Sequence, residues 1–589
     1  MSWLLIAITV VLRLNNLSMV NLNLKAAVKQ KYDAIVVGSG ISGGWAAKEL
    51  TEKGLKTLLI ERGREVKHIE DYPTATLLPF EMKHRGQLPH QVIEENPIVS
   101  KCYAFNETTA HFFVKDKEHP YVQEKPFSWI RAYQTGGKSL LWARQVQRWS
   151  SFDFEGPARD GYAVEWPIGY EDLAPWYSHV EKFAGISGNK DGLPHLPDGE
   201  FLPPFPLNCV EKYFSEFVAQ QYKDRQVIVA RCAHITDPQP IHFQQGRAKC
   251  QHRTLCERGC PFGGYFSSNA STIPWAMKTG NLTLLSNALV AEVIFDEKKN
   301  RASGVRVVDT LTGESKEYFA KIIFVNAAAL NSNLILLNSK SNRFPNGLGN
   351  DNGLMGKYVA FHNYKAGINA EYEGHLQIKT DGRRPTSGYI PRFRNLHKQE
   401  MDFLRGYATS FSASRNYGTD TSDIGENLKN SLANPSLNGH WNIGAGMMGE
   451  TIPKITNFVA LDEKLKDAFG MPQLRISVDY DDNDHKMTLD FVDQFSEMFT
   501  KAGFKNLKIR NVNHPPGLDI HEMGGIRMGK DRRTSLLNKW NQLHECPNVF
   551  VTDGSCMTST STQNPSLTYM ALSARAANYA VEALKKKLL

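Results

Sequence analysis

Three closely spaced cysteines form a strong chemical signal in this chain. Cys250, Cys256 and Cys260 have the spacing Cys-x5-Cys-x3-Cys, and Pro261 follows directly. Three thiolates with a proline after the last one are typical of iron-sulfur ligation. A structural zinc site usually has four ligands, so zinc would need a further one, for which His252 is a candidate. Three reduced, unliganded thiols are the third interpretation. Eight cysteines in 589 residues do not indicate a disulfide scaffold.

A glycine-rich turn near the N-terminus predicts a dinucleotide site. Gly38, Gly40 and Gly43 form a Gly-x-Gly-x-x-Gly motif between an apolar run at 32–37 and a helical pattern at 42–53. The first glycine permits a tight turn, the second lets the backbone approach a pyrophosphate, and the third lets helix and strand pack closely. The N–H groups at the start of the helix would then face the phosphates.

Glu61 narrows the choice of nucleotide. It ends the next predicted strand, at 55–60, where an acid binds the 2′-hydroxyl of an adenosine ribose. Because a carboxylate disfavours a 2′-phosphate, NADP is disfavoured. The motif alone leaves both NAD and FAD open.

The bulk properties bound the class of protein. A chain of 589 residues exceeds one ordinary core, so two structural units are expected. The net charge of +8 is mild for this length, and there is no basic block with interleaved aromatics, so nucleic acid is not a predicted partner.

Residues 1–30 are interpreted as an N-terminal extension. Ser2 to Leu12 is mostly apolar but too short to span a bilayer, and it lacks a basic leader region and a clear cleavage site. A start at Met19 is one interpretation, and a weak signal peptide or anchor is the other. No later segment is predicted to span a membrane.

The pattern of elements predicts a domain built from separated segments. Buried strands are expected at 32–37, 55–60 and 321–326, antiparallel strands over 282–308, and a long helix over 565–588. Because the nucleotide signals lie at the beginning, middle and end of the chain, a second domain would be inserted between them. We predict a cofactor-binding domain from 31–150, 250–345 and 515–589, and a substrate-binding domain from 151–249 and 346–514.

Four segments resemble, in order, the motifs of the glucose-methanol-choline (GMC) oxidoreductase family. Residues 131–140 are similar to its Gly-Gly-x-Ser flavin segment, and 166–177 to the entry of its substrate domain. Residues 521–529 are similar to its His-x-x-Gly-Thr-x-x-Met-Gly element, and 551–568 to its closing segment. Each motif is modest, but together they cover about residues 30–585. Gly525 stands where the family usually has Thr, a departure that concerns cofactor packing rather than a catalytic base.

The resemblance implies an α/β fold: a discontinuous Rossmann-like FAD-binding domain and a substrate domain with a largely antiparallel sheet. It implies FAD as cofactor, with contacts beyond the glycine turn and Glu61 from Arg131, Gly136, Gly137, Ser139, Asp553 and Gly554. Asn326 would approach the adenosine part.

The family's catalytic pair falls on His521 and Asn564. A largely neutral imidazole can accept the hydroxyl proton of an alcohol, and an amide can donate to the substrate oxygen. His514 and His362 are the nearest competitors for the base; His514 is expected in a loop and His362 at a position where the family often has a structural histidine.

The cysteine spacing resembles the large subunits of bacterial membrane-linked sugar dehydrogenases of the same family. Those subunits hold a [3Fe-4S] cluster with three cysteines, travel with a small export subunit, and pass electrons to a cytochrome c. The resemblance therefore implies a periplasmic enzyme exported with its partner, with a cytoplasmic enzyme as the alternative. Nothing in the spacing favours Cys232 as an outlying ligand.

Residues 43–50 and the cysteines look most like glucoside 3-dehydrogenase large subunits, which make 3-keto sugars. The expected function is oxidation of a sugar or glycoside hydroxyl. The alternatives are a cluster-free oxidase or choline- or gluconate-type dehydrogenase, and an inactive flavoprotein serving as a carrier subunit. Trp142, Trp149 and Trp441 could stack on a sugar, although core packing is the simpler interpretation.

Overall fold

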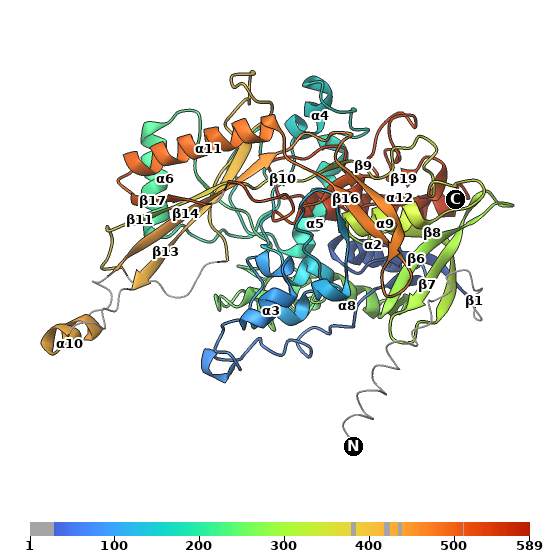
Figure 1. Ribbon diagram of the computed structural model, residues 1–589, viewed down its shortest axis with the longest axis horizontal. Coiled ribbons are helices and arrows are strands. Elements are labelled where there is room, and N and C mark those ends of the chain that lie inside the picture. Colours follow the sequence, from blue (N-terminus) through green and yellow to red (C-terminus); the bar gives the residue numbers. More distant parts are fainter. Residues whose placement is uncertain (1–28, 379–384, 418–423, 434–438, 511) are drawn as a thin grey trace, which may run out of the picture.

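The computed structural model describes residues 29–589 apart from 379–384, 418–423, 434–438 and 511. The predictions made for the first 28 residues lie outside the described residues. Figure 1 shows two β-rich regions at opposite ends of the molecule, with helices between them and against each.

The first sheet contains the strands predicted for nucleotide binding. Its central strand β1 pairs in parallel with β2 and with β8, so that Val36 lies beside Leu59 on one side and Phe324 on the other. All three of these side chains are fully buried, as expected for a parallel sheet covered on both faces. The strand order is β19-β20-β8-β1-β2-β5, and β7 pairs with β8 and β6. The strands are β1 (Lys29–Val37), β2 (Thr57–Ile60), β5 (Leu282–Leu285), β6 (Ala288–Asp296), β7 (Arg301–Asp309), β8 (Ser315–Val325), β19 (Gln542–Leu543) and β20 (Cys546–Phe550).

Helices from distant parts of the chain cover this sheet. The C-terminal α12 (Ser566–Lys585) packs on both α2 (Ile41–Glu52) and α5 (Tyr170–Ala184), and α8 (Thr272–Lys278) packs on α2. Trp45 of α2 and Tyr177 of α5 are fully buried in one continuous core with β1 and β2. Helix α5 therefore packs with the nucleotide-binding sheet, although the predicted division of the chain assigns it to the substrate-binding domain; that division stays a prediction.

The second sheet is antiparallel and lies at the other end of the molecule. Its longest strands, β13 and β14, pair along their whole length, and α11 lies across one face of the sheet (Figure 1). Phe214 of α6, Phe491 of α11 and Trp441 fill the core between them. The order is β17-β11-β14-β13-β12-β4, with β10 paired to β14. The elements are β4 (Ile228–Val229), β10 (His362–Asn363), β11 (Gly367–Tyr372), β12 (Gly388–Ile390), β13 (Tyr407–Tyr417), β14 (Gly439–Glu450), β17 (Lys505–Ile509), α6 (Cys209–Gln221) and α11 (Asp482–Lys501).

A third sheet joins segments from all over the chain. Its order is β18-β9-β15-β16-β3, from β3 (Val122–Gln123), β9 (Lys357–Ala360), β15 (Phe458–Lys466), β16 (Pro472–Ser477) and β18 (Met523–Gly525). The remaining helices are α3 (His90–Glu95), α4 (Ser151–Arg159), α7 (Pro240–Gln244), α9 (Ala329–Asn338) and α10 (Glu426–Ala433), and short 3₁₀ turns include η5 (Gly137–Leu140), η6 (Cys256–Arg258) and η7 (Gly554–Cys556).

The predicted mixed α/β architecture is confirmed. The antiparallel pattern expected over 282–308 is mainly the β6–β7 hairpin, and the helix expected over 565–588 is α12. None of the helices in the described ranges is long and apolar enough to cross a membrane.

Candidate active site

A cavity of about 310 Å³ opens at the carboxyl ends of the parallel strands. Val37 at the end of β1, Ile60 at the end of β2 and Asn326 directly after β8 all line it. This edge is where open parallel sheets bind their ligands. The cavity continues toward the second sheet, where Tyr364 and Met448 contribute to its wall.

The three motif glycines occupy the three structural positions predicted for them. Gly38 has φ +90°, and a Cβ there would lie 2.3 Å from the backbone oxygen of Asn326. Gly40 lines the cavity, and a Cβ there would meet nothing within 4 Å, so its backbone is open to an approaching ligand. A Cβ on Gly43 would lie 1.8 Å from the Gly38 oxygen, so this glycine permits the close approach of helix and turn.

Glu61 is anchored at the cavity edge by the turn itself. Its carboxylate accepts hydrogen bonds from the Ser39 hydroxyl (2.5 Å) and backbone N–H (3.2 Å), and from the Gly63 N–H (3.0 Å). Burial raises the pKa of Glu61, and these donors act in the opposite direction by stabilising the carboxylate. The Ser39 hydroxyl also accepts from the Gly136 N–H (2.9 Å), which ties the Gly-Gly loop to the turn.

The Gly-Gly loop, Gly136–Gly137–Lys138–Ser139, contributes to the wall of the cavity. Gly136 has φ +84°, and a Cβ there would collide with the Asn269 side chain at 1.6 Å. Gly137 and Ser139 line the cavity, whereas Gly136 lies behind them. Ser139 donates to the Gly136 carbonyl (2.6 Å) and accepts from the Ser268 N–H (3.0 Å), so the loop has a defined shape.

Arg131 also lines the cavity, and its guanidinium is held in place by contacts with the protein, although its Nε and Nη2 make no hydrogen bond within the described residues. Nη1 donates to the His119 carbonyl (2.6 Å), Nη2 lies 3.6 Å from Asp116, and the group stacks on Trp129 and Tyr121. These contacts stiffen the wall that Arg131 belongs to.

The closing segment supplies an acid on the same cavity. Asp553 is buried and accepts from the Ser332 hydroxyl (2.5 Å) and from the hydroxyl and N–H of Ser555 (2.5 and 3.0 Å). Burial raises the pKa of Asp553. Gly554 follows it into the 3₁₀ turn η7, and both residues line the cavity.

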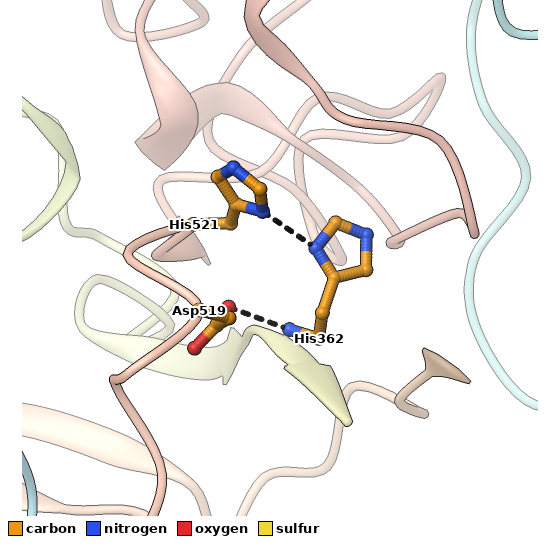
Figure 2. A group of neighbouring side chains, drawn as sticks. All are labelled: His362, Asp519 and His521. Carbon is orange, nitrogen blue, oxygen red and sulfur yellow. Dashed lines mark hydrogen bonds between the residues drawn. The ribbon is translucent and has the colours of Figure 1, made fainter. Parts of the chain in front are cut away.

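Two histidines from distant segments meet at the other end of the cavity. Strands β9 and β18 are antiparallel with Met523 beside Ala360, so that, two residues beyond this pair, His521 comes opposite His362. Their Nδ1 atoms are 3.0 Å apart, and the rings meet at 82°. Figure 2 shows this contact together with Asp519, whose Oδ2 accepts from the backbone N–H of His362 at 2.9 Å.

The environment keeps both imidazoles neutral. Burial, His362 and Lys138 hold the pKa of His521 well below its usual range, and burial lowers the pKa of His362 to about 4. Burial raises the pKa of Asp519 to about 7, and Glu522 adds to the effect. His521 lines the cavity and is only partly buried, and in the described part of the chain its Nε2 makes no hydrogen bond. The imidazole of His521 therefore borders the cavity with one ring nitrogen that a ligand could contact.

Asn564 lines the same cavity as His521 and directly precedes Pro565, the N-cap of α12. The competing His514 does not; its Nε2 lies 2.7 Å from the Tyr364 carbonyl. Among the tryptophans, Trp142 lines the cavity, and Trp149 and Trp441 are fully buried in cores. Sequence reasoning treated His362 as structural and missed Asp519, although Asp519 lies two residues before the histidine motif.

The three clustered cysteines surround a second, smaller cavity. Cys250, Cys256 and Cys260 line it together with His234 and Tyr265. His252 and Cys232 are not among its lining residues; Cys232 instead contacts the Ser187 hydroxyl at 3.2 Å.

Arg144 lies between the two cavities. It lines the large one, it is buried, and its guanidinium pairs with Glu257, the residue after Cys256, at 2.9 Å. One side chain thus spans from the wall of the large cavity to the cysteine loop.

Comparison with known proteins identifies the family to which the chain belongs. Two family models described as GMC oxidoreductase match residues 205–362 and 453–573. The 2-methyl-1,2-propanediol dehydrogenase of Mycolicibacterium austroafricanum is 27% identical over 93% of this chain and 94% of its own. The chain is a GMC oxidoreductase. The fructose dehydrogenase large subunit of Gluconobacter japonicus is 23% identical over 94% of this GMC oxidoreductase and 98% of its own length. A C-glycoside 3-oxidase of Arthrobacter globiformis is 33% identical over 132 residues, 22% of this chain and 25% of its own.

The GMC family uses FAD to oxidise alcohol groups, and the cavity of this GMC oxidoreductase fits that cofactor. Seven of its lining residues have buried polar atoms without a hydrogen-bond partner in the described ranges. Three are the arginines Arg62, Arg131 and Arg144, and the other atoms are Asn326 Nδ2, Asp519 Oδ1, Glu522 Oε1 and Tyr569 Oη. A polar ligand in the cavity would supply the missing partners. The residues that would hold FAD are those of the glycine turn, Glu61, the Gly-Gly loop and the Asp553–Gly554 segment.

The departure at Gly525 has a local reason in this GMC oxidoreductase. Gly525 has φ +90°, and a Cβ there would lie 2.4 Å from the Asn333 side chain. A threonine would clash and would be strained in this backbone conformation. Asn333 donates to the Gly524 carbonyl at 3.2 Å, so this amide takes the space that a side chain would fill.

Proposed function

We propose that this GMC oxidoreductase is a dehydrogenase that oxidises a hydroxyl of a sugar or glycoside, at carbon 3, with His521 as the base and Asn564 as the donor to the substrate oxygen. The observation that carries this proposal is the histidine pair. The depressed pKa of His521 keeps its ring neutral, and its Nδ1 contacts His362. The ring lines the cavity, and its Nε2 makes no hydrogen bond to any residue that the structure describes.

The chemistry of His521 depends on which of its nitrogens holds the proton. For Nε2 to accept a hydroxyl proton, the proton of the neutral ring must be on Nδ1, where it is donated to His362 Nδ1. His362 Nδ1 can accept that proton when the proton of the neutral His362 ring is on Nε2. His362 therefore acts as a positioning residue that selects the basic tautomer.

The roles proposed for FAD, Asn564 and the cavity walls follow from their positions around the cavity. Bound FAD supplies the hydride acceptor. Asn564 lines the cavity with His521 and can donate an amide N–H to the substrate oxygen without competing for its proton. The walls formed by the Gly-Gly loop and by residues 518–522 hold the substrate carbon in place and limit access of water.

The relatives support the substrate class. One is named for a diol, one for fructose and one for oxidation of C-glycosides at position 3. The choice of carbon 3 rests on the last of these together with the resemblance of residues 43–50 and of the cysteine run to glucoside 3-dehydrogenases.

We also propose that Cys250, Cys256 and Cys260 hold a [3Fe-4S] cluster, which would supply a one-electron carrier. Among the described residues, one group of three or more His, Cys, Asp or Glu side chains has its ligand atoms within 4.8 Å of one another, and it consists of His362, Asp519 and His521. The sulfur atoms of the three cysteines are therefore spread more widely than 4.8 Å. A single tetrahedral zinc with bonds of about 2.3 Å would draw its sulfurs to within about 4 Å of one another. The wider spacing around one cavity favours a cluster.

Electron exit of this kind implies partners. A small export subunit and a cytochrome c acceptor would accompany the chain, and the enzyme would work in the periplasm; a cytoplasmic enzyme is the alternative. The relative from Gluconobacter is itself named as a large subunit, which supports a multi-subunit enzyme.

The test is anaerobic purification followed by absorption spectroscopy, iron and sulfide analysis, and substrate titration. We expect flavin bands, about three irons per chain, and flavin bleaching by a methyl glucoside with formation of a 3-keto product. Bleaching by choline or gluconate instead would overturn the sugar assignment. Flavin without iron, reoxidised rapidly by O₂, would turn the proposal to an oxidase, which the C-glycoside 3-oxidase relative makes the second candidate.

A further inference from the structure

A buried histidine outside the cysteine run lies on the cysteine cavity. His234 belongs to a short extended segment that is joined to both ends of the cysteine loop. The Cys250 N–H donates to the Ile235 carbonyl, and the Ile235 N–H donates to the Gly264 carbonyl, each at 2.8 Å. His234 itself forms a β-bridge with Tyr265. The backbone thus holds His234 against the loop whatever its side chain is.

The imidazole makes one polar contact, and that contact is with a cysteine of the loop. His234 Nε2 lies 3.8 Å from Cys256 Sγ, within the range of a hydrogen bond to sulfur. The side chain is 1% exposed, and its Nδ1 has no partner among the described residues. Tyr265 and Phe205 pack against the ring and restrict its rotation. A buried imidazole oriented in this way toward one sulfur requires an explanation.

We propose that His234 donates its Nε2–H to the Cys256 sulfur and thereby raises the reduction potential of the iron-sulfur cluster; this inference rests on the cluster of the proposed function. A sulfur bound to iron carries no proton, so the hydrogen in this contact must come from the imidazole. Reduction adds negative charge to the cluster and its sulfurs, and a donor stabilises the more negative state. Hydrogen bonds to the sulfurs are one of the means by which proteins set cluster potentials.

The position of His234 separates its effect from substrate oxidation. It lines the cysteine cavity and does not line the large cavity, to which Arg144 and Trp142 belong. A change at His234 should therefore leave reduction of the flavin by substrate unaltered and affect the cluster alone. Arg144, which lines the large cavity, would not give this separation.

The experiment compares His234→Leu with the matched control His234→Gln in the whole, anaerobically purified enzyme. Leucine removes the donor, and glutamine keeps an N–H near the position of Nε2. Iron and sulfide content are measured first, and the cluster midpoint potential is then measured by redox titration followed by electron paramagnetic resonance. We expect the leucine variant to keep its iron and to disfavour cluster reduction by about tenfold, which is about 59 mV for a one-electron couple. The glutamine variant should stay close to the wild type.

Other outcomes separate this inference from the proposed function. A leucine variant with normal iron and an unchanged potential would overturn the donor role of His234 and leave the cluster in place. Loss of iron from the leucine variant alone would also overturn it, because His234 would then be a ligand. A wild-type enzyme without iron would remove the cluster itself, and the inference with it.

Discussion

Replacing His362 tests the central feature of the proposed site, the pairing of two histidines. In a His362→Leu variant, the Nδ1–H of His521 loses its acceptor, because Nδ1 of His362 is its one hydrogen-bond partner in the described residues. The His521 proton can then move to Nε2 at no cost, and the ring in that tautomer cannot accept the substrate proton. The matched control is His362→Asn, whose amide oxygen stands near the position of Nδ1.

The expected magnitude follows from burial. His362 is fully buried, so leaving the facing N–H without a partner costs about 1–3 kcal/mol. At about 1.4 kcal/mol per factor of ten, the first-order rate of flavin reduction should fall by about 5- to 150-fold. The asparagine variant should recover most of that rate.

The assay is anaerobic stopped-flow reduction of the bound flavin at saturating substrate, with the flavin content of each variant measured beforehand. Because His362 does not line the large cavity, both variants should keep their FAD. A leucine variant with full cofactor and the wild-type rate would refute the argument. Equal losses in the leucine and asparagine variants would show that His362 is needed only for packing.

Four further outcomes are expected. The flavin-reduction rate of the wild type should change little between pH 8 and pH 6, because the pKa of His521 is depressed and its base form persists. An imidazole with the ordinary pKa of about 6.5 would lose about three quarters of its base form by pH 6. A fall of that size in a pH-jump experiment would contradict the assignment of His521 as the base. Gly525→Thr should lower the free energy of unfolding by about 1–3 kcal/mol in urea titrations, because of the positive φ and the contact with Asn333, and an unchanged midpoint would count against the strain. Glu61→Gln should weaken FAD retention by about tenfold or more in equilibrium dialysis, since it replaces a charged acceptor, and equal retention would exclude that role. Cys256→Ser should lose iron while keeping FAD, whereas full iron content would remove Cys256 as a ligand.

Local patterns were enough to predict the turn, the main strands of the nucleotide-binding sheet, and two of the helices that cover it, α2 and α12. The tight turn at Gly38 and the close approach at Gly43 agree with the prediction, because both depend only on the backbone of the turn and on its two flanking elements, whereas their role in cofactor binding stays a prediction. The family assignment was likewise possible because its motifs are short and keep their order. The predicted α/β fold and the GMC family are both confirmed.

Spacing along the chain could not identify the side chains that meet across it. The sequence offered His252 as a fourth group beside the cysteines because it is close in number, whereas the structure places His234 there, 22 residues before Cys256. Helix α5 was grouped with the substrate-binding segments, yet it packs on α12 beside the first sheet. In both cases the partners are brought together by pairings and packing of distant segments, which no local periodicity encodes.

The pair of His521 and His362 shows the same difference between what the sequence predicts and what the tertiary structure adds. The sequence by itself placed His521 in a segment that resembles the family's histidine motif and predicted the chemistry of a base for it, a role that stays a prediction. Only the tertiary structure decided that His521 meets His362, 159 residues away, because that contact follows from the antiparallel register of β9 and β18. Residue types and short spacings determine which chemistry a chain can perform, and long-range strand pairing, through burial and register, decides which groups perform it together.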